Sequence, residues 1–259
     1  MLVRDEADVI DLNLAYHLAR GVDEVIVTDH RSIDGTRERL KALDDPRIHV
    51  LHEDGETIEQ ATWVTRMARM AHDLGADWVL NDDADEFLWP EAGDLKEALA
   101  RVPRMCAKLE LRRLDFVARP DDPRPFFERM TVRTTTDELG RPLRPKLAHR
   151  ARAHVVVGPG SHMVRRAGWR TCHRALVTVL HFPRRTLEQY RHKVAIGGAT
   201  PGYDHKRMAA AHAALLHGRL DARYEQATRA HDGLVHDARL QEFLSEKWEA
   251  LLSTYGRPH

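Results

Sequence analysis

The chain has 259 residues and a mass of 29.7 kDa, enough for one substantial core. Its 40 Lys and Arg residues balance its 40 Asp and Glu residues, so we expect no broad positive surface for nucleic acid. Two cysteines are too few for a disulfide framework, and no apolar run approaches the roughly 20 residues of a membrane-spanning helix. We therefore expect a cytoplasmic protein with no integral membrane segment, and leave peripheral membrane association open.

The first 90 residues alternate between short apolar runs and amphipathic segments. Strands alternating with helices favour a parallel sheet with both faces covered, as in the α/β class. The expected strands are 1–3, 25–28, 47–51 and 78–80, and the expected helices are 7–20, 36–43 and 58–71.

The pattern changes after Pro90. The next expected elements are a helix over 95–101 and strands over 108–117, 127–133, 154–157 and 176–182. From residue 186 to the end the pattern is mostly helical. We therefore expect one domain over 1–185, whose second half (91–185) contains a mixed sheet, with a helical segment (186–259) packed on it. This segment could cover the sheet, close over an acceptor site or form a homodimer contact.

Four carboxylates stand within five positions, directly after the strand expected at 78–80. They are Asp82, Asp83, Asp85 and Glu86. Like charges this close repel and raise one another's pKa values, which a divalent cation would reverse. Hard oxygen ligands suit Mg²⁺ or Mn²⁺. A solvated acidic loop is the alternative, but apolar residues on both sides of the cluster favour a metal site.

A second polar segment, 29–36, joins the strand expected at 25–28 to the next helix. Asp34, Gly35 and Thr36 offer a turn and a helix N-cap. Such a capped turn accounts for Asp34 and Gly35, but it does not account for Asp29 at the end of the strand. This position therefore remains a candidate for ligand contact.

Four short motifs occur in order over about the first 90 residues: Arg4-Asp5-Glu6, then 16–22 (YHLARGV), 29–36 (DHRSIDGT) and 83–87 (DADEF). Together they resemble family-2-like glycosyltransferases of GT-A fold. The segment 180–194 also resembles a later motif of that family. The family usually has Asn where Asp5 stands, and its residues before Asp-Gly-Thr differ from Ser32-Ile33.

The resemblance implies a GT-A-like fold, in which a mostly parallel nucleotide-binding sheet (1–90) merges into a mixed acceptor half (91–185) with a helical C-terminus. It also implies transfer of a sugar from a UDP- or GDP-linked donor to a saccharide or other hydroxyl acceptor, with inversion and with Mn²⁺ or Mg²⁺. The residues implied for the metal are Asp83, Asp85 and His181, and those implied for the donor are Arg4, Glu6, Asp29, Asp34 and Asp83.

Other candidates lie in the second half of the chain. Arg185 and Lys193 are eight positions apart on an expected helix and could contact phosphate oxygens, or could form a solvated helix face. His162 is our candidate for positioning substrate or acting as the base that deprotonates the acceptor, and Asp115 and Glu110 are alternatives.

Two other functions remain open. One is a GT-A module that binds a nucleotide without turnover. The other is a metal-dependent phosphohydrolase, which would also use an Asp-x-Asp motif. In that chemistry the motif follows the first strand, whereas here it follows the fourth expected strand.

Overall fold

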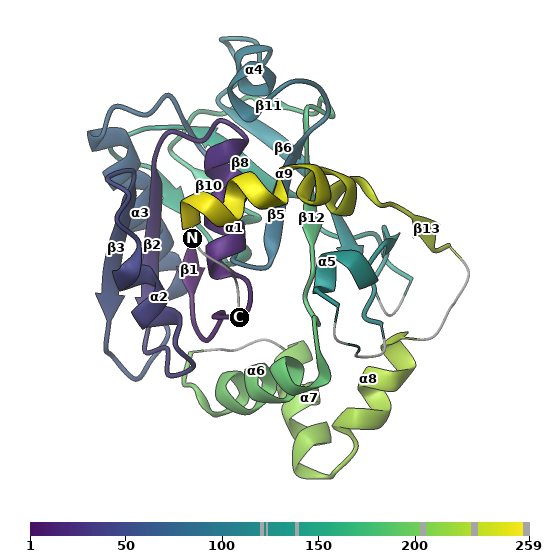
Figure 1. The fold of residues 1–259 in the computed structure, drawn as a ribbon. Helices are drawn as coiled ribbons and strands as arrows, with labels where there is room; N and C mark the ends of the chain where they lie inside the picture. Colours follow the sequence, from purple (N-terminus) through teal and green to yellow (C-terminus); the bar gives the residue numbers. More distant parts are fainter. Residues whose placement is uncertain (120–121, 123, 138–139, 203–205, 229–232, 256–259) are drawn as a thin grey trace.

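The computed structural model describes residues 1–119, 122, 124–137, 140–202, 206–228 and 233–255. Three short parallel strands form a small sheet in the order β1-β2-β3 at one side of the molecule (Figure 1). They are β1 (Leu2–Val3), β2 (Val25–His30) and β3 (Ile48–Glu53). The helices that follow them are α1 (Ile10–Ala19), α2 (Thr36–Ala42) and α3 (Gln60–Asp73).

Helix α1 is buried on every side, although three of its residues are polar or charged. Ile10 and Leu14 are fully buried in the core that α1 shares with β2, β5 and the C-terminal helix. Asn13 and His17 are also buried, so their side chains need partners inside the protein. Both find these partners in residues 82–86, which follow strand β4 (Trp78–Val79) and are called here the acidic segment.

The second sheet is mixed and has eight strands in the described residues. Strand β6 lies at its centre, and β12 lies between β6, to which it is parallel, and β5, to which it is antiparallel. The strands are β4 (Trp78–Val79), β5 (Glu86–Pro90), β6 (Lys108–Phe116), β7 (Val132–Thr134), β8 (Lys146–Arg150), β11 (Thr171–Cys172), β12 (Val177–His181) and β13 (Val235–His236). A separate pair is formed by β9 (Val156–Val157) and β10 (Val164–Arg165), beside a 3₁₀ turn at Pro159–Ser161.

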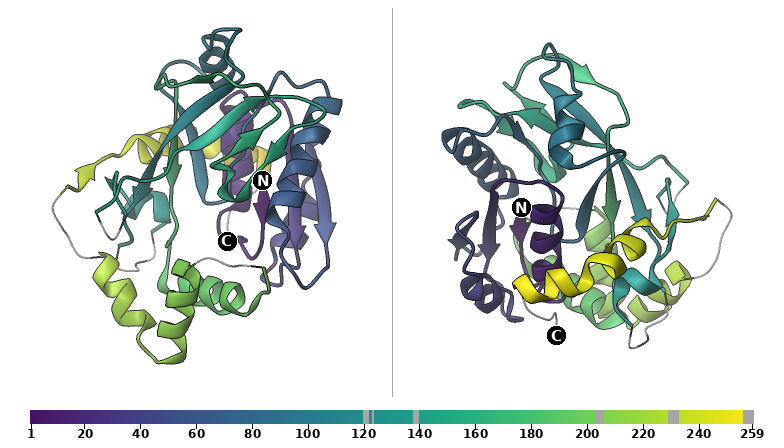
Figure 2. Two further views of the ribbon diagram at one scale, coloured as in Figure 1. Left: turned by 180° about the vertical axis from the view of Figure 1, so that it is seen from behind. Right: turned by 45° about the horizontal axis from the view of Figure 1, so that its top comes forward.

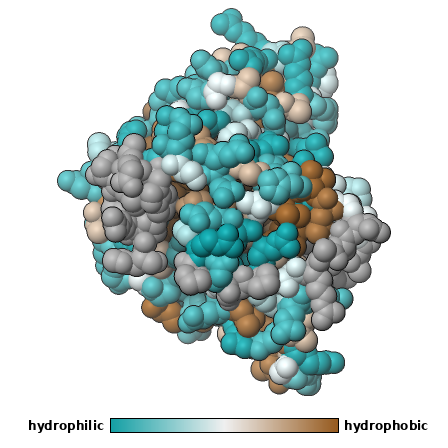
Figure 3. Space-filling view, turned by 45° about the vertical axis from the view of Figure 1, so that its right-hand side comes forward, coloured by the Kyte–Doolittle hydropathy of each residue, from teal (hydrophilic) through white to brown (hydrophobic). Residues whose placement is uncertain are grey.

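Helices α6, α7 and α8 gather at the end of the molecule opposite α4 (Figures 1 and 2). The remaining helices are α4 (Leu95–Ala100), α5 (Phe126–Arg129), α6 (Leu187–Ala199), α7 (Lys206–Leu216), α8 (Leu220–Thr228) and α9 (Arg239–Tyr255). Leu240 and Leu244 of α9 belong to the same core as Ile10 of α1, so the two ends of the chain are packed together. Hydrophilic residues cover most of the face in Figure 3. No described helix is long and apolar enough to cross a bilayer.

The mixed α/β class is confirmed, but one strand is not where the alternating pattern predicts. We expected the segment 78–80 to join the parallel sheet; instead Trp78 and Val79 pair antiparallel with Arg150 and His149 of β8. The chain contacts the parallel sheet at Asp83, four positions after Val79, through a parallel bridge with Leu2. The acidic segment therefore crosses from one sheet to the other.

The expected strand over 127–133 is also wrong in its first half. Phe126 and Phe127 lie in the short helix α5, and only Val132–Thr134 pairs as β7. Both rings are buried, whereas neighbouring residues on a strand would point to opposite faces of the sheet. Strand β5, in contrast, escaped sequence analysis because it begins with Glu86.

Candidate functional site

A pocket of about 380 Å³ opens where β1, the acidic segment and the end of β12 meet helix α6. Loops at the carboxyl ends of strands, close to α6, supply most of its polar side chains. Six of the predicted site residues line it: Arg4, Glu6, Asp83, Asp85, His181 and Lys193.

The backbone of the acidic segment is held by α1. The amide of Asn13 donates to the carbonyl oxygens of Ala84 and Glu86, at 2.9 and 2.7 Å. The ring of Phe87, 0% exposed, packs edge-on against Tyr16 and Phe182. These contacts fix the direction of each carboxylate, so four neighbouring acids reach different surroundings.

Asp83 and Glu86 share one buried lysine. Lys146, 2% exposed, donates to Oδ2 of Asp83 at 2.8 Å and also contacts Oε2 of Glu86. Burial raises the pKa of Glu86 to about 7, against the attraction of Lys146. Asp83 also lines a second, larger cavity, so it stands at the wall between the two.

Asp85 points into the pocket and is surrounded by cations. Its Oδ2 accepts a hydrogen bond from Nζ of Lys193 at 2.8 Å and lies 3.8 Å from Arg185, while its Oδ1 lies 3.7 Å from Nε2 of His181. Burial alone would raise the pKa of Asp85, but the charges of Lys193, His181 and Arg185 outweigh it and lower the pKa. Asp85 is therefore a carboxylate.

Arg185 forms the floor beneath this cluster. It is 1% exposed and binds Glu6 at 2.5 Å and both oxygens of Asp8 at 2.7 and 2.8 Å. Lys193 bridges the other oxygen of Glu6, at 3.0 Å, to Asp85. Arg185 does not line the pocket, because its guanidinium is enclosed by carboxylates. Contact between Arg185 and a ligand stays a prediction.

His181 is oriented by Asp115 on the neighbouring strand. Its Nδ1 lies 2.9 Å from Oδ1 of Asp115, and Arg113 holds the same carboxylate at 2.8 Å. Nδ1 therefore carries a proton, and Nε2 faces Asp85. Burial alone would lower the pKa of His181, but the charges of Asp115 and Asp85 raise it. A carboxylate behind an imidazole is also the usual arrangement around a histidine that binds a metal.

These side chains offer suitable donor atoms for a divalent cation, although their positions do not form a ready-made metal centre. Oδ1 of Asp83, Oδ1 of Asp85 and Nε2 of His181 accept no hydrogen bond from a described residue, and oxygen with imidazole suits Mn²⁺ or Mg²⁺. Among the described residues, however, no three such groups are close enough to hold an ion as they stand. Repulsion between the acids is offset by Lys146, Lys193 and Arg185, so a metal is not required to keep them together.

The other predicted site residues do not all lie at the pocket. Arg4 does: it donates to Thr200, the residue that follows α6, at 2.9 Å. Asp29 is 0% exposed, binds Arg37 at 2.7 Å and does not line the pocket. Asp34 accepts from the backbone amides of Ala7 and Thr36, at 2.9 and 3.0 Å, and so shapes the turn before α2.

The three candidate bases are separated by the structure. His162 hydrogen-bonds the carbonyl oxygen of Pro145 at 2.7 Å and does not line the pocket. Glu110 pairs with His173 at 3.2 Å, also away from it. Asp115 does line the pocket, but its pKa is lowered: burial would raise it, and His181 and Arg113 outweigh burial. A depressed pKa makes Asp115 a weak base.

Sequence reasoning missed Lys146 and Asp8. Lys146 stands in a stretch rich in arginine, and nothing in the sequence marks it as the buried partner of Asp83 and Glu86. Asp8 follows Glu6 by two positions, and its pairing with Arg185 joins residues 177 positions apart. Neither contact has a local signal.

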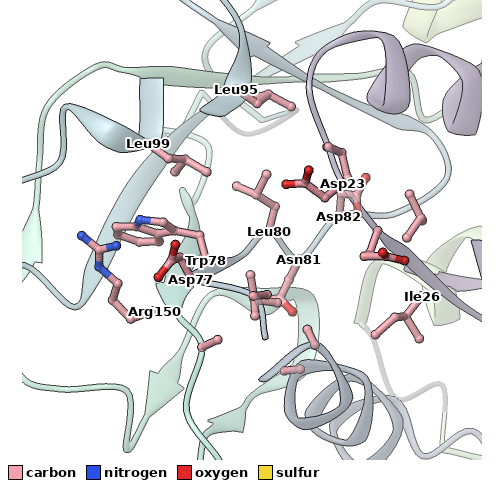
Figure 4. Close-up of a pocket in the computed structure, with 18 of the residues that line it drawn as sticks. Asp23, Ile26, Asp77, Trp78, Leu80, Asn81, Asp82, Leu95, Leu99 and Arg150 are labelled. Carbon is pink, nitrogen blue, oxygen red and sulfur yellow. The ribbon is translucent and has the colours of Figure 1, made fainter. Parts of the chain in front are cut away.

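The larger cavity, of about 1250 Å³, lies between β2, α3, β4 and α4 (Figure 4). Trp78, Leu80, Leu95 and Leu99 give it an apolar lining, with carboxylates such as Asp82 at its edge. Asp83 is the residue it shares with the smaller pocket. Basic groups line both cavities, the larger one through Lys96, Arg104, Arg150 and Arg152. Asp85 and His181 line only the smaller pocket, which makes it the better candidate for a metal ion with an anionic ligand.

Replacement of Lys146 by methionine is expected to lower the free energy of unfolding by about 1–3 kcal/mol, because Glu86 loses its buried partner. Asp83 is 40% exposed in its side chain and can be rehydrated. Glu86 binds a proton more readily as the pH falls, so urea unfolding should show a larger loss at pH 8 than at pH 5. Lys96→Met, at an exposed lysine, is the control and should change little. Equal losses at both pH values would contradict this account.

No protein-family model matches the sequence, and no curated protein matches it either. Three solved structures are similar in overall fold. Residues 1–349 of S. aureus TarS in complex with UDP match 98% of this chain and 78% of that one, at 14% identity and a TM-score of 0.42. A longer S. aureus TarS structure matches 86% of this chain and 42% of its own, at 15% identity and a TM-score of 0.42. Mannosyltransferase PcManGT from Pyrobaculum calidifontis, in complex with GDP-Man and Mn²⁺, matches 98% and 83%, at 17% identity and a TM-score of 0.40. These similarities are too distant to carry an argument about activity, which has to come from the site.

Proposed function

We propose that this chain is a divalent-metal-dependent glycosyltransferase that takes a sugar from a nucleotide-sugar. The observation that carries the proposal is the composition of the smaller pocket. Asp83, Asp85 and His181 present metal-binding atoms to this pocket, and Arg4 and Lys193 present cations to it. A nucleoside diphosphate joined to a metal ion needs both. The order of the four N-terminal sequence motifs supports the same reaction class.

Asp83, Asp85 and His181 would hold the cation, and oxygens of the diphosphate would complete its coordination. When bound, the cation supplies Lewis-acid stabilisation of the departing nucleoside diphosphate. Asp115 keeps Nε2 of His181 directed at Asp85 through its own bond to Nδ1. This orients the imidazole without any change in the backbone.

Lys193 would change partners when the donor binds. It is 27% exposed in its side chain and now bridges Glu6 and Asp85. On its flexible stem, the ammonium group of Lys193 would reach phosphate oxygens of a bound donor in place of Asp85. Arg185 would stay in place beneath and hold the side chain of Glu6 through their hydrogen bond. The part proposed for Arg185 is therefore to position Glu6.

The proposal covers any nucleotide base, donor sugar and acceptor. We retain inversion at the anomeric carbon as part of it, to be checked by NMR of the product. Asp29 and Asp34 are now proposed to shape the loop before α2, since their carboxylates are occupied by Arg37 and by backbone amides.

Thermal unfolding should show joint binding of nucleotide and metal. UDP or GDP together with Mn²⁺, at about 100 times the dissociation constant, is expected to stabilise the chain by roughly 2.7 kcal/mol, or several degrees in Tm. Nucleotide or Mn²⁺ alone should give much less, because each leaves like charges facing one another. Indifference to every nucleotide–metal pair would overturn the proposal.

Turnover separates the three candidate functions. Release of nucleoside diphosphate from a panel of nucleotide-sugars would support the transferase. Binding without release would indicate a nucleotide-binding module, and phosphate release from simple phosphoesters would indicate a phosphohydrolase.

A further inference from the structure

One end of the molecule carries an excess of positive charge, although Glu110 at its margin pairs with His173 at 3.2 Å. This end consists of 101–109, after α4, and 163–174, around β11, and is called here the basic tip. Neither segment contains Asp or Glu, although the whole chain is electrically balanced. The two segments are joined where β11 pairs with the start of β6 and where the amide of Ala107 donates to the carbonyl oxygen of Arg170 at 2.9 Å. The exposed arginines of the basic tip are Arg101, Arg104, Arg165, Arg166, Arg170 and Arg174.

None of these six arginines forms an ion pair with a described residue, a feature that they share with exposed arginines elsewhere, such as Arg31 and Arg144. What distinguishes the basic tip is that neither of its two segments holds an acidic residue. An excess of like charge on one part of a surface is relieved when a partner of opposite charge approaches. The tip therefore fits an anionic surface.

Two large apolar side chains stand among these arginines. Trp169 is 86% exposed and Met105 is 65% exposed, the first and fourth most exposed of the large hydrophobic residues among those described. The guanidinium of Arg170 links them: it lies 3.0 Å from Sδ of Met105 and 5.6 Å from the centre of the Trp169 ring.

The backbone conformation of the turn that carries Trp169 exposes its side chain to solvent. Arg166 and Gly168 both have positive φ, at 59° and 128°. A Cβ on Gly168 would lie 2.4 Å from that of Ala107, so only glycine lets this turn pack on the segment below it. The ring is thereby presented to solvent at a convex point, and no partner within the described protein covers it.

We propose that the basic tip docks on the surface of a membrane containing anionic phospholipid. Arginines would contact the lipid phosphates, while Trp169 and Met105 would enter the interfacial layer, where tryptophan is favoured. A soluble polyanion would satisfy the arginines but would not account for a lone projecting tryptophan and its methionine neighbour. The surface does not depend on the proposed glycosyltransferase activity.

Docking of the basic tip would also fix the distance between the smaller pocket and the membrane surface. Strand β6 runs from Lys108 at the basic tip to Asp115, which lines the smaller pocket. Seven residues of strand span roughly 23 Å. Helices α6 to α8 lie at the opposite end (Figures 1 and 2). A docked molecule would therefore hold its pocket above the lipid surface and keep α6, α7 and α8 in water.

Vesicle flotation of the full chain tests this. Vesicles of phosphatidylcholine mixed with phosphatidylglycerol should bind the protein at low salt, and vesicles of phosphatidylcholine alone should bind it far less. Arg165→Gln, Arg166→Gln and Arg170→Gln together should weaken partitioning on the order of a hundredfold. Trp169→Ser with Met105→Ser should weaken it on the order of tenfold.

Leu216→Ser is the matched control, because Leu216 is 72% exposed on α7 at the far end of the molecule, and it should leave partitioning unchanged. Thermal unfolding of each variant verifies that it folds. No binding to anionic vesicles at low salt would overturn the proposal. The proposal would also be overturned if the protein bound duplex DNA or heparin but not vesicles, and if Trp169→Ser left that binding unchanged. This outcome would assign the basic tip to soluble polyanions.

Discussion

Replacement of Asp85 by asparagine is expected to reduce release of nucleoside diphosphate from the correct donor by on the order of a thousandfold. The side chain keeps its size but loses the charge that attracts the cation, and its amide would face Lys193 and Arg185 as a neutral group. The metal-dependent rise in Tm with UDP or GDP should disappear in the same variant. Both measurements use purified full-length chain.

Asp82→Asn is the control for this experiment. Asp82 lies in the same acidic segment, but it faces the larger cavity and stands 3.5 Å from His17. Removal of its charge should leave nucleoside diphosphate release within a few-fold of the unmodified chain. If both variants lose activity equally, the acidic segment acts as a whole and the assignment of Asp85 fails.

Replacement of Arg185 by methionine is expected to lower the free energy of unfolding by about 3–5 kcal/mol. Arg185 is 1% exposed, and its loss would leave Glu6, Asp8 and Asp85 as facing carboxylates around an uncharged side chain. Protonation of these groups would relieve the repulsion, so the loss should shrink as the pH falls toward 4. Urea unfolding at several pH values measures both effects.

Arg191→Met provides the comparison. Arg191 lies on α6, six positions after Arg185, and also pairs with an aspartate, Asp221, but both side chains are about half exposed. An exposed pair is screened by water, so the variant should unfold almost as the unmodified chain does. Equal losses for Arg185 and Arg191 would contradict the role given to the buried cluster.

Several local features could be predicted from the sequence because their causes are local. The apolar runs at 25–28 and 176–182 became β2 and β12, and the amphipathic run at 58–71 became α3. Gly21, with φ of 91°, ends the first helix as expected. Two expectations failed because residues far away in the chain decide the local structure. Trp78 pairs with Arg150 of β8 and not with the parallel sheet, and Phe127, expected in a strand, lies in helix α5 with its ring buried.

The sequence also identified the residues of the candidate site better than their roles. Asp83, Asp85, Glu6, Arg4, His181 and Lys193 line one pocket, and their roles in binding stay predictions. Asp29 and His162 do not, because Arg37 and the carbonyl oxygen of Pro145 already occupy their polar atoms. A partner of this kind leaves no mark near the residue it binds.

The amino-acid sequence by itself determined the α/β class, most of the helices and strands, and which acids are candidates for chemistry, since each follows from short-range patterns of polarity. The tertiary structure alone decided how those acids are kept together. Lys146 and Arg185 come from positions 60 to 179 residues away from the carboxylates they neutralise. A charge in a protein interior is stable only with an opposite charge beside it, and which charge that is depends on how the two sheets pack rather than on the neighbours in the chain.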